Sequence, residues 1–118
     1  MVLYRNDYLF LDNQISYFKR SLFQLISDFG PNYQGNFMIS FNDIKNGTGR
    51  ERLTNVMLED YEDYLRNHGF NVEPGRDCLL LSTNARSVVT VGNESIDLSN
   101  ALAQFRARAM LNGDTDNM

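Results

Sequence analysis

The most regular hydrophobic pattern of the chain lies at its N-terminus. Apolar or aromatic residues recur there at alternating steps of three and four: Met1, Tyr4, Tyr8, Leu11, Ile15, Phe18, Leu22, Leu25 and Phe29. This spacing predicts a helix with a heptad-like seam. Gly30 and Pro31 then end the helix, because glycine suits a left-handed C-terminal position and proline cannot continue the turn. Residues 4–11 remain open between helix and strand, since the run YLFL fits both.

The apolar stripe of this first helix is wider than a two-stranded coiled coil requires, so two interpretations stand side by side. The stripe packs on the core of its own domain, or part of it remains uncovered and drives self-association or docking. The candidate association face consists of five seam positions: Tyr8, Leu11, Ile15, Phe18 and Leu22.

A second helix is predicted from Thr48 to His68. Thr48 and Glu51 have the spacing of a capping box, and Gly69 provides a C-terminal stop. Projected at the helical period, one broad face is apolar and consists of Leu53, Val56, Met57, Tyr61, Tyr64 and Leu65. Asp60 falls at the margin of that face, where a carboxylate needs hydrogen bonds or water.

The charges of this helix run against its dipole. Arg50 and Arg52 fall in the predicted first turn, whereas carboxylates are favoured there by roughly 0.3–1 kcal/mol each. Acidic residues gather in the second half, where cations are favoured. We interpret this group as a candidate surface for a basic protein partner, against the alternative of a solvated acidic face: Glu59, Asp60, Glu62, Asp63 and Arg66.

Strand signals follow a loop at residues 30–36. Asn36–Phe41 reads as one strand, and a β-meander is expected after it, with short strands at Phe70–Glu73, Cys78–Ser82, Ser87–Val91 and Ser95–Leu98. Ser99 or Asp97 then caps a last helix that ends at Gly113. We expect one α+β domain over residues 1–113, with a polar tail at residues 114–118. Its fold is two-layered: a mostly antiparallel sheet of about five short strands with two or three helices packed on it. If the strand at 36–41 lies beside the strand at 70–73, the helix between them forms a right-handed crossover.

Composition narrows the functional classes. The chain has 118 residues, of which 42% are hydrophobic, and a net charge of −4, which argues against nucleic acid as a partner because phosphate binding needs Lys and Arg. No apolar run is long enough for a membrane span, and the N-terminus lacks the pattern of a signal peptide. A cytoplasmic location is expected, or a virion if the chain is phage-encoded.

The chemistry-bearing residues are few. One cysteine, Cys78, cannot form an intramolecular disulfide, and a single histidine, His68, offers no partners for a metal or a catalytic triad. The glycine-rich stretch NGTGRER before the predicted second helix, with Lys45, Arg50 and Arg52, is a candidate anion site, although it matches neither the Walker nor the dinucleotide pattern. We therefore expect a non-enzymatic protein-binding or assembly module without a cofactor. The alternative is a small phosphate- or nucleotide-binding module at residues 46–52.

Overall fold

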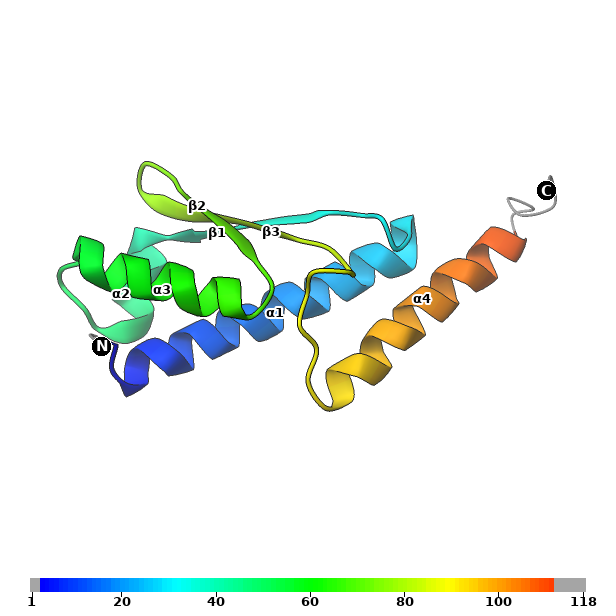
Figure 1. Ribbon diagram of the computed structural model, residues 1–118, viewed down its shortest axis with the longest axis horizontal. Coiled ribbons are helices and arrows are strands. Elements are labelled where there is room, and N and C mark those ends of the chain that lie inside the picture. Colours follow the sequence, from blue (N-terminus) through cyan, green and yellow to red (C-terminus); the bar gives the residue numbers. More distant parts are fainter. Residues whose placement is uncertain (1–2, 112–118) are drawn as a thin grey trace.

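The computed structural model describes residues 3–111 (Figure 1). Within this range the chain forms, in order, α1 (Arg5–Phe29), β1 (Gly35–Ser40), α2 (Phe41–Thr48), α3 (Asn55–Asn67), β2 (Asn71–Pro74), β3 (Cys78–Thr83) and α4 (Asn93–Leu111). The strands form one antiparallel sheet in the order β1-β3-β2. The α+β class is as predicted. The prediction of about five strands with two or three helices is wrong, since the described residues contain four helices and three strands.

The sheet has one covered face and one open face. Ile39 of β1 pairs with Leu79 of β3, and Val72 of β2 pairs with Leu81 of β3. These side chains are buried against α1 and α3, which lie together on one side of the sheet in Figure 1. The alternate residues point to the other face, as the period of two along a strand requires. Met38 and Leu80 are exposed there.

The first helix is continuous from Arg5 to Phe29, so the open question at residues 4–11 is resolved in favour of helix. The backbone N–H of Tyr4 donates to the carboxylate of Asp7 at 2.8 Å, which satisfies one of the free donors at the helix N-terminus. Gly30 ends the helix at φ 108°, a conformation that L side chains rarely adopt. The predicted heptad seam is buried in its middle part, at Leu11, Ile15, Phe18 and Leu22, whereas Tyr4 and Phe29 near its two ends are exposed; its first position, Met1, lies outside the described residues.

The predicted long helix from Thr48 to His68 is wrong, because the chain ends one helix and starts another within it. Thr48 is the last residue of α2, and its hydroxyl donates to the carbonyl of Ile44 at 2.6 Å. Gly49 follows in the left-handed conformation at φ 77° and terminates α2. The true N-cap of α3 is Thr54, whose hydroxyl accepts from the N–H of Met57 at 3.2 Å. The glycine after Thr48 therefore decides the local structure.

The predicted strands at Ser87–Val91 and Ser95–Leu98 are also absent from the described residues. The side chain of Asn84 accepts from the N–H groups of Arg86 and Ser87 at 3.0 and 2.9 Å, which fixes a turn instead. Gly92 has a positive φ, and α4 begins at Asn93, inside the segment expected to be a hairpin. Short alternation of β-branched residues did not distinguish strand from helix here. The predicted end of this helix, Gly113, and the tail at 114–118 lie outside the described residues.

The condition for a right-handed crossover between the first two strands is not met. β1 does not lie beside β2, because β3 lies between them. A short loop after Pro74 instead turns the chain back, and β3 inserts between the two earlier strands. β3 is the most apolar of the three strands, CLLLST, which fits the central position in a sheet.

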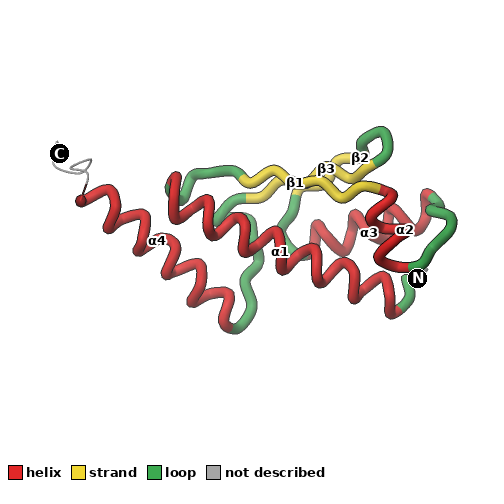
Figure 2. The backbone as a smooth tube through the Cα atoms, turned by 180° about the vertical axis from the view of Figure 1, so that it is seen from behind, coloured by secondary structure: helices red, strands yellow, loops and turns green. Residues whose placement is uncertain are grey.

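The core divides into two parts along α1. The larger cluster joins α1 to the sheet, α2 and α3, and the smaller one joins the second half of α1 to α4 and Val88. The molecule measures 56 × 29 × 20 Å, and its radius of gyration is 16.7 Å, against about 13.5 Å for a compact domain of this length. Figures 1 and 2 show the reason: α4 runs along the side of α1 and extends beyond its end.

Candidate functional site

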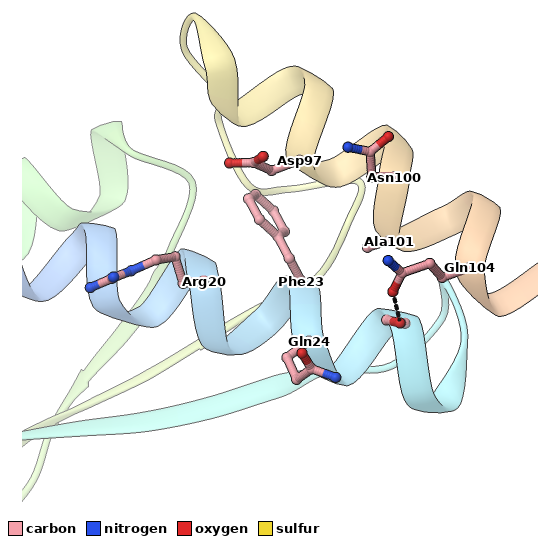
Figure 3. A pocket seen from close by; sticks show the side chains of 8 residues that line it. Arg20, Phe23, Gln24, Asp97, Asn100, Ala101 and Gln104 are labelled. Atoms are coloured by element: carbon pink, nitrogen blue, oxygen red, sulfur yellow. Dashed lines mark hydrogen bonds between the residues drawn. The ribbon is translucent and has the colours of Figure 1, made fainter.

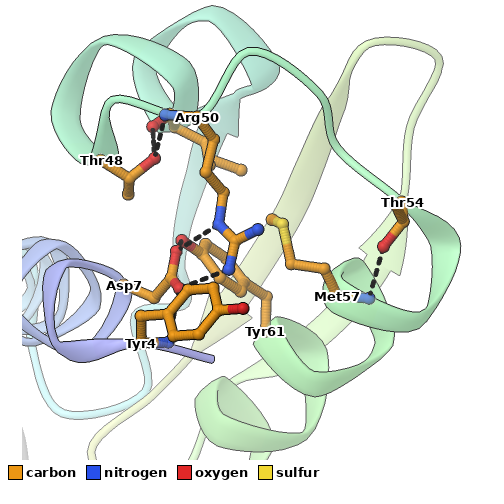
Figure 4. A network of polar contacts seen from close by, with 8 residues as sticks. Tyr4, Asp7, Thr48, Arg50, Thr54, Met57 and Tyr61 are labelled. Atoms are coloured by element: carbon orange, nitrogen blue, oxygen red, sulfur yellow. Dashed lines mark hydrogen bonds and ion pairs between the residues drawn. The ribbon is translucent and has the colours of Figure 1, made fainter. Parts of the chain in front are cut away.

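The most elaborate polar site centres on Asp7 in the first turn of α1 (Figure 4). Its two carboxylate oxygens accept hydrogen bonds from Nε and a terminal nitrogen of Arg50 at 2.8 and 2.7 Å. The hydroxyl of Tyr61 on α3 donates at 2.6 Å, and the N–H of Tyr4 donates at 2.8 Å. The guanidinium also lies 5.2 Å from the centre of the Tyr4 ring, as a cation–π contact requires. Asp7 therefore ties α1 to α3 and to the link between α2 and α3.

The electrostatics of this site favour a structural role. Asp7 is only 1% exposed and Arg50 is 20% exposed at the side chain. Burial raises the pKa of Asp7, but the hydrogen bonds from Arg50, Tyr4 and Tyr61 and the charge of Arg50 outweigh burial and lower the pKa to about 2. Burial and the neighbouring Asp7 raise the pKa of Tyr61. A carboxylate that is stabilised in its charged form and fully hydrogen-bonded is a poor proton acceptor. Its role here is to hold α1, α3 and the link between α2 and α3 together, and we call the contact of Asp7 with Arg50 and Tyr61 the latch.

The candidate anion site at residues 46–52 loses its geometric basis. Gly47 and Thr48 belong to the end of α2, and the following loop does not run directly into a helix N-terminus. Arg50 points to Asp7, while Lys45 and Arg52 are exposed on different segments. The three cations are thus not brought together around one group of free N–H donors. The glycines serve the termination of a helix.

The acidic residues of α3 are partly neutralised within the protein. Arg66 donates to Glu62 at 3.0 Å and lies 3.5 Å from Asp63, and it also donates to the carbonyl of Val72 at 3.2 Å. Glu59 is exposed. Because α3 begins at Asn55, neither Arg50 nor Arg52 stands in its first turn, and Arg66 in its last turn agrees with the dipole. The opposition of charge and dipole at the N-terminal end was therefore a consequence of misplaced helix ends, whereas Glu62 and Asp63 do lie in the second half of α3. Asp60, half-buried at the margin of the apolar face, also lies on this helix.

The candidate association face of α1 lies mostly in the core. Leu11, Ile15, Phe18 and Leu22 are at most 4% exposed. Tyr8 is half-buried, with its ring 5.3 Å from that of Tyr64. In the folded chain these four core side chains are already covered, so a partner would have to bind elsewhere.

A second set of polar contacts attaches α4 to α1. The ammonium of Lys19, at 3% side-chain exposure, donates to Glu94 at 2.9 Å. The same carboxylate oxygen accepts from the N–H of Val91 at 2.9 Å and so caps α4. Further along, the hydroxyl of Ser27 donates to Gln104 at 2.7 Å. These contacts fix the position of α4 through few groups.

A groove of about 290 Å³ separates the two helices (Figure 3). The ring of Phe23 points into it, and polar side chains from both helices surround it: Arg20, Gln24, Asp97, Asn100 and Gln104. This rim offers hydrogen-bond donors and acceptors but no nucleophile paired with a base. The single histidine of the chain lies outside the groove, with its Nδ1 2.8 Å from the carbonyl of Tyr64.

Sequence reasoning missed the two buried charges, although a signal was present. Asp7 precedes Leu11 and Ile15 at helical spacing, and Lys19 lies between Ile15 and Leu22 in the same way. A charged residue on the apolar stripe of a helix must find a partner. What the sequence could not supply is the identity of the partners, Arg50 and Glu94, which come from distant segments.

Among residues 3–111, no group of acidic, histidine or cysteine side chains has the arrangement of a metal site. No helix in the same range is long and apolar enough to cross a membrane. Comparison with models of known protein families, with curated proteins and with solved structures found no match. The surfaces of the molecule itself are therefore the basis of the functional proposal.

Proposed function

We propose that the chain is a non-enzymatic protein-binding module that docks a helical segment of a partner protein along α4. One observation carries this proposal: among the 19 residues of α4, Ala101 is the only one that is buried. In proteins, most helix stability comes from tertiary packing of an apolar face rather than from the intrinsic helix propensity of the segment. A helix so weakly covered gains stability when a partner covers it.

The outer side of α4 has the pattern that such docking requires. Ile96, Ala103 and Met110 follow one another at intervals of seven residues, on the side opposite to the residues that face α1. Ile96 is 59% exposed and Met110 is 65% exposed. Ala107 is exposed on the same side, and small residues allow a second helix to approach closely. We call Ile96, Ala103, Ala107 and Met110 the outer stripe of α4.

The alternative function, a phosphate or nucleotide site, is not supported by any contact among the described residues. Its three cations are dispersed, and Arg50 is held by Asp7. The acidic face of α3 gives weaker support for protein binding than the outer stripe, because Glu62 and Asp63 already have Arg66 as a partner.

Site-specific photo-crosslinking tests the proposal. A photoreactive amino acid at position 103 should capture one protein from an extract of the source cells, whereas the same amino acid at Asn13, exposed on α1, should not. Met110→Glu should abolish the capture at position 103, because it replaces the last large apolar side chain of the outer stripe with a charge that the contact would have to bury.

The folded state provides the control, since both Met110 and Asn13 are exposed and their replacement by glutamate should leave the circular dichroism spectrum unchanged. If capture persists in Met110→Glu, or is equal at positions 13 and 103, the outer stripe is not the surface that binds the partner.

A further inference from the structure

The sheet has two outer edges, and they differ in how their backbone groups are oriented and covered. In an antiparallel ladder, residues alternate between those whose N–H and C=O face the neighbouring strand and those whose groups face away. The N–H of Phe41 donates to the carbonyl of Asp77 at 2.9 Å, in register with the pairing of β1 and β3. Alternation from this pair places the N–H and C=O of Asn36 and Met38 on the free edge of β1.

The outer edge of β2, in contrast, is protected against pairing with another strand. Gly75 N–H donates to the carbonyl of Cys78 at 2.8 Å, so Val72 and Pro74 face away from β3. Pro74 has no N–H to offer, and the carbonyl of Val72 accepts from Arg66 at 3.2 Å. Proline and a covering side chain are the devices by which proteins prevent a sheet edge from pairing with another strand.

β1 carries none of these devices. Its sequence, GNFMIS, contains neither a charge nor a proline. Met38 is 57% exposed and Asn36 is exposed as well. Figure 2 views the sheet from the β1 side, and no element of the described chain crosses in front of this strand. The edge is therefore open along its length, which proteins ordinarily avoid unless it is used.

The side of α1 beneath this edge is uncharged from Phe10 to Leu25. Phe10 of α1 packs against Gly47 of α2, which marks the side of α1 that lies toward β1. Continuing at helical spacing along that side come Gln14, Tyr17, Ser21 and Leu25; the next residue in this row, Asp28, is charged and pairs with Arg108 of α4. Tyr17 is 59% exposed. The opposite flank of α1 is occupied by α3 and α4.

We propose that this side of the molecule binds a second copy of the chain, with the two β1 strands paired antiparallel about a two-fold axis at Met38. This register sets Met38 against Met38 of the other copy and Asn36 against its Ser40, so apolar meets apolar and polar meets polar. On the open face Leu80 already lies beside Met38, and the pairing extends this row across both copies. The sheet becomes six-stranded, with the uncharged flanks of the two α1 helices side by side. This surface is separate from the outer stripe of α4.

Light scattering after gel filtration, over a wide range of concentration, tests the dimer in the full chain. The wild type should pass from monomer to dimer, and Met38→Lys should raise the dissociation constant by roughly tenfold or more, because it places like charges opposite each other. Val56→Lys is the matched control, since Val56 is equally exposed, at 57%, but lies on α3. A wild type that is monomeric at every concentration, or equal weakening by both variants, would overturn the proposal.

Spin labels test the register. With Cys78→Ser as background, a label at position 38 should report a shorter distance between copies than a label at position 36, because the two-fold axis passes through residue 38. Equal distances would place the axis at residue 37 and overturn the register. If the chain is a monomer and this edge pairs with a strand of a different protein, the proposal that a second copy binds here is overturned.

Discussion

The two ends of α1 hold their neighbours in different ways. At its N-terminal end, Asp7 is saturated by four hydrogen bonds and sits beside a large apolar cluster that includes Tyr61 and the sheet. Toward its C-terminal end, α4 is attached through polar contacts of Lys19, Ser27 and Asp28 over a small cluster. We call residues 3–83 the body and α4 the arm. The same helix thus serves both as the centre of the large core and as the support of a weakly covered element.

The largest expected effect comes from breaking the latch of the body. Asp7→Ala leaves Arg50 partly buried without its carboxylate and leaves the hydroxyl of Tyr61 without an acceptor. Removal of one partner of a buried ion pair costs about 3–5 kcal/mol. Urea denaturation should show a loss of this size in the free energy of unfolding. Asp43→Ala, at an exposed aspartate of α2, is the control and should change the unfolding midpoint little.

Acid should weaken the body through the same residue. The pKa of Asp7 is about 2 in the folded chain, against 3.8 for an aspartate outside the fold. Its contribution to the free energy of unfolding is therefore complete above pH 3.8 and is lost as the pH falls through 2. The shift corresponds to about 2 kcal/mol. The difference in unfolding free energy between wild type and Asp7→Asn should therefore shrink between pH 5 and pH 2 by roughly this amount. A constant difference across this range would contradict the low pKa.

The arm should respond to a smaller and local perturbation. Glu94→Gln leaves the ammonium of Lys19, at 3% exposure, without a carboxylate, which we expect to cost about 1–3 kcal/mol. Hydrogen exchange should accelerate in α4 and remain unchanged in β3. Lys19→Met should be milder, because Glu94 is 28% exposed at its side chain and still caps α4 through Val91. If Glu94→Gln and Lys19→Met accelerated exchange in α4 equally, the difference in burial between Lys19 and Glu94 would not determine the size of the effect.

The smallest effect is expected at the outer contact between arm and body. Arg108 pairs with Asp28 at the surface, where both side chains are well exposed. Hydrogen bonds from Arg108 and Gln24 lower the pKa of Asp28, but exposed pairs contribute little because water and salt screen them. Arg108→Ala should leave the urea midpoint within experimental error. A clear loss of stability would show that the last turns of α4 matter more than their burial indicates.

The sequence predicted those elements whose signals were both local and unambiguous. The heptad seam of α1 and the strands near residues 36–41, 70–73 and 78–82 correspond to observed elements, because their periodicity and flanking turns agree. The segment at residues 87–98 carried alternation and turn residues but forms a turn and a helix. Its turn is fixed by Asn84 and the start of its helix by Glu94, whose side-chain contacts with the backbone depend on short-range geometry rather than on pattern.

The helix ends were the weakest part of the sequence reasoning, and the site depended on them. Placing one helix over residues 48–68 put Arg50 in a helical turn, where its charge appeared to oppose the dipole. In the structure Arg50 lies in the link and reaches back to Asp7, 43 residues earlier. A pairing over such a distance has no local signature, so neither the latch nor the weak cover of α4 could be predicted from one sequence.

Native-state hydrogen exchange, resolved along the chain, distinguishes a stable body with a weakly held arm from a chain that unfolds as one unit. Amides of α4 should open with a lower free energy than those of β3 and the N-terminal half of α1, and with a weaker dependence on denaturant, because opening of the arm exposes less surface than global unfolding. Opening of α4 and β3 at one common free energy, with one common dependence on denaturant, would mean that the chain unfolds as a single unit and would contradict the account.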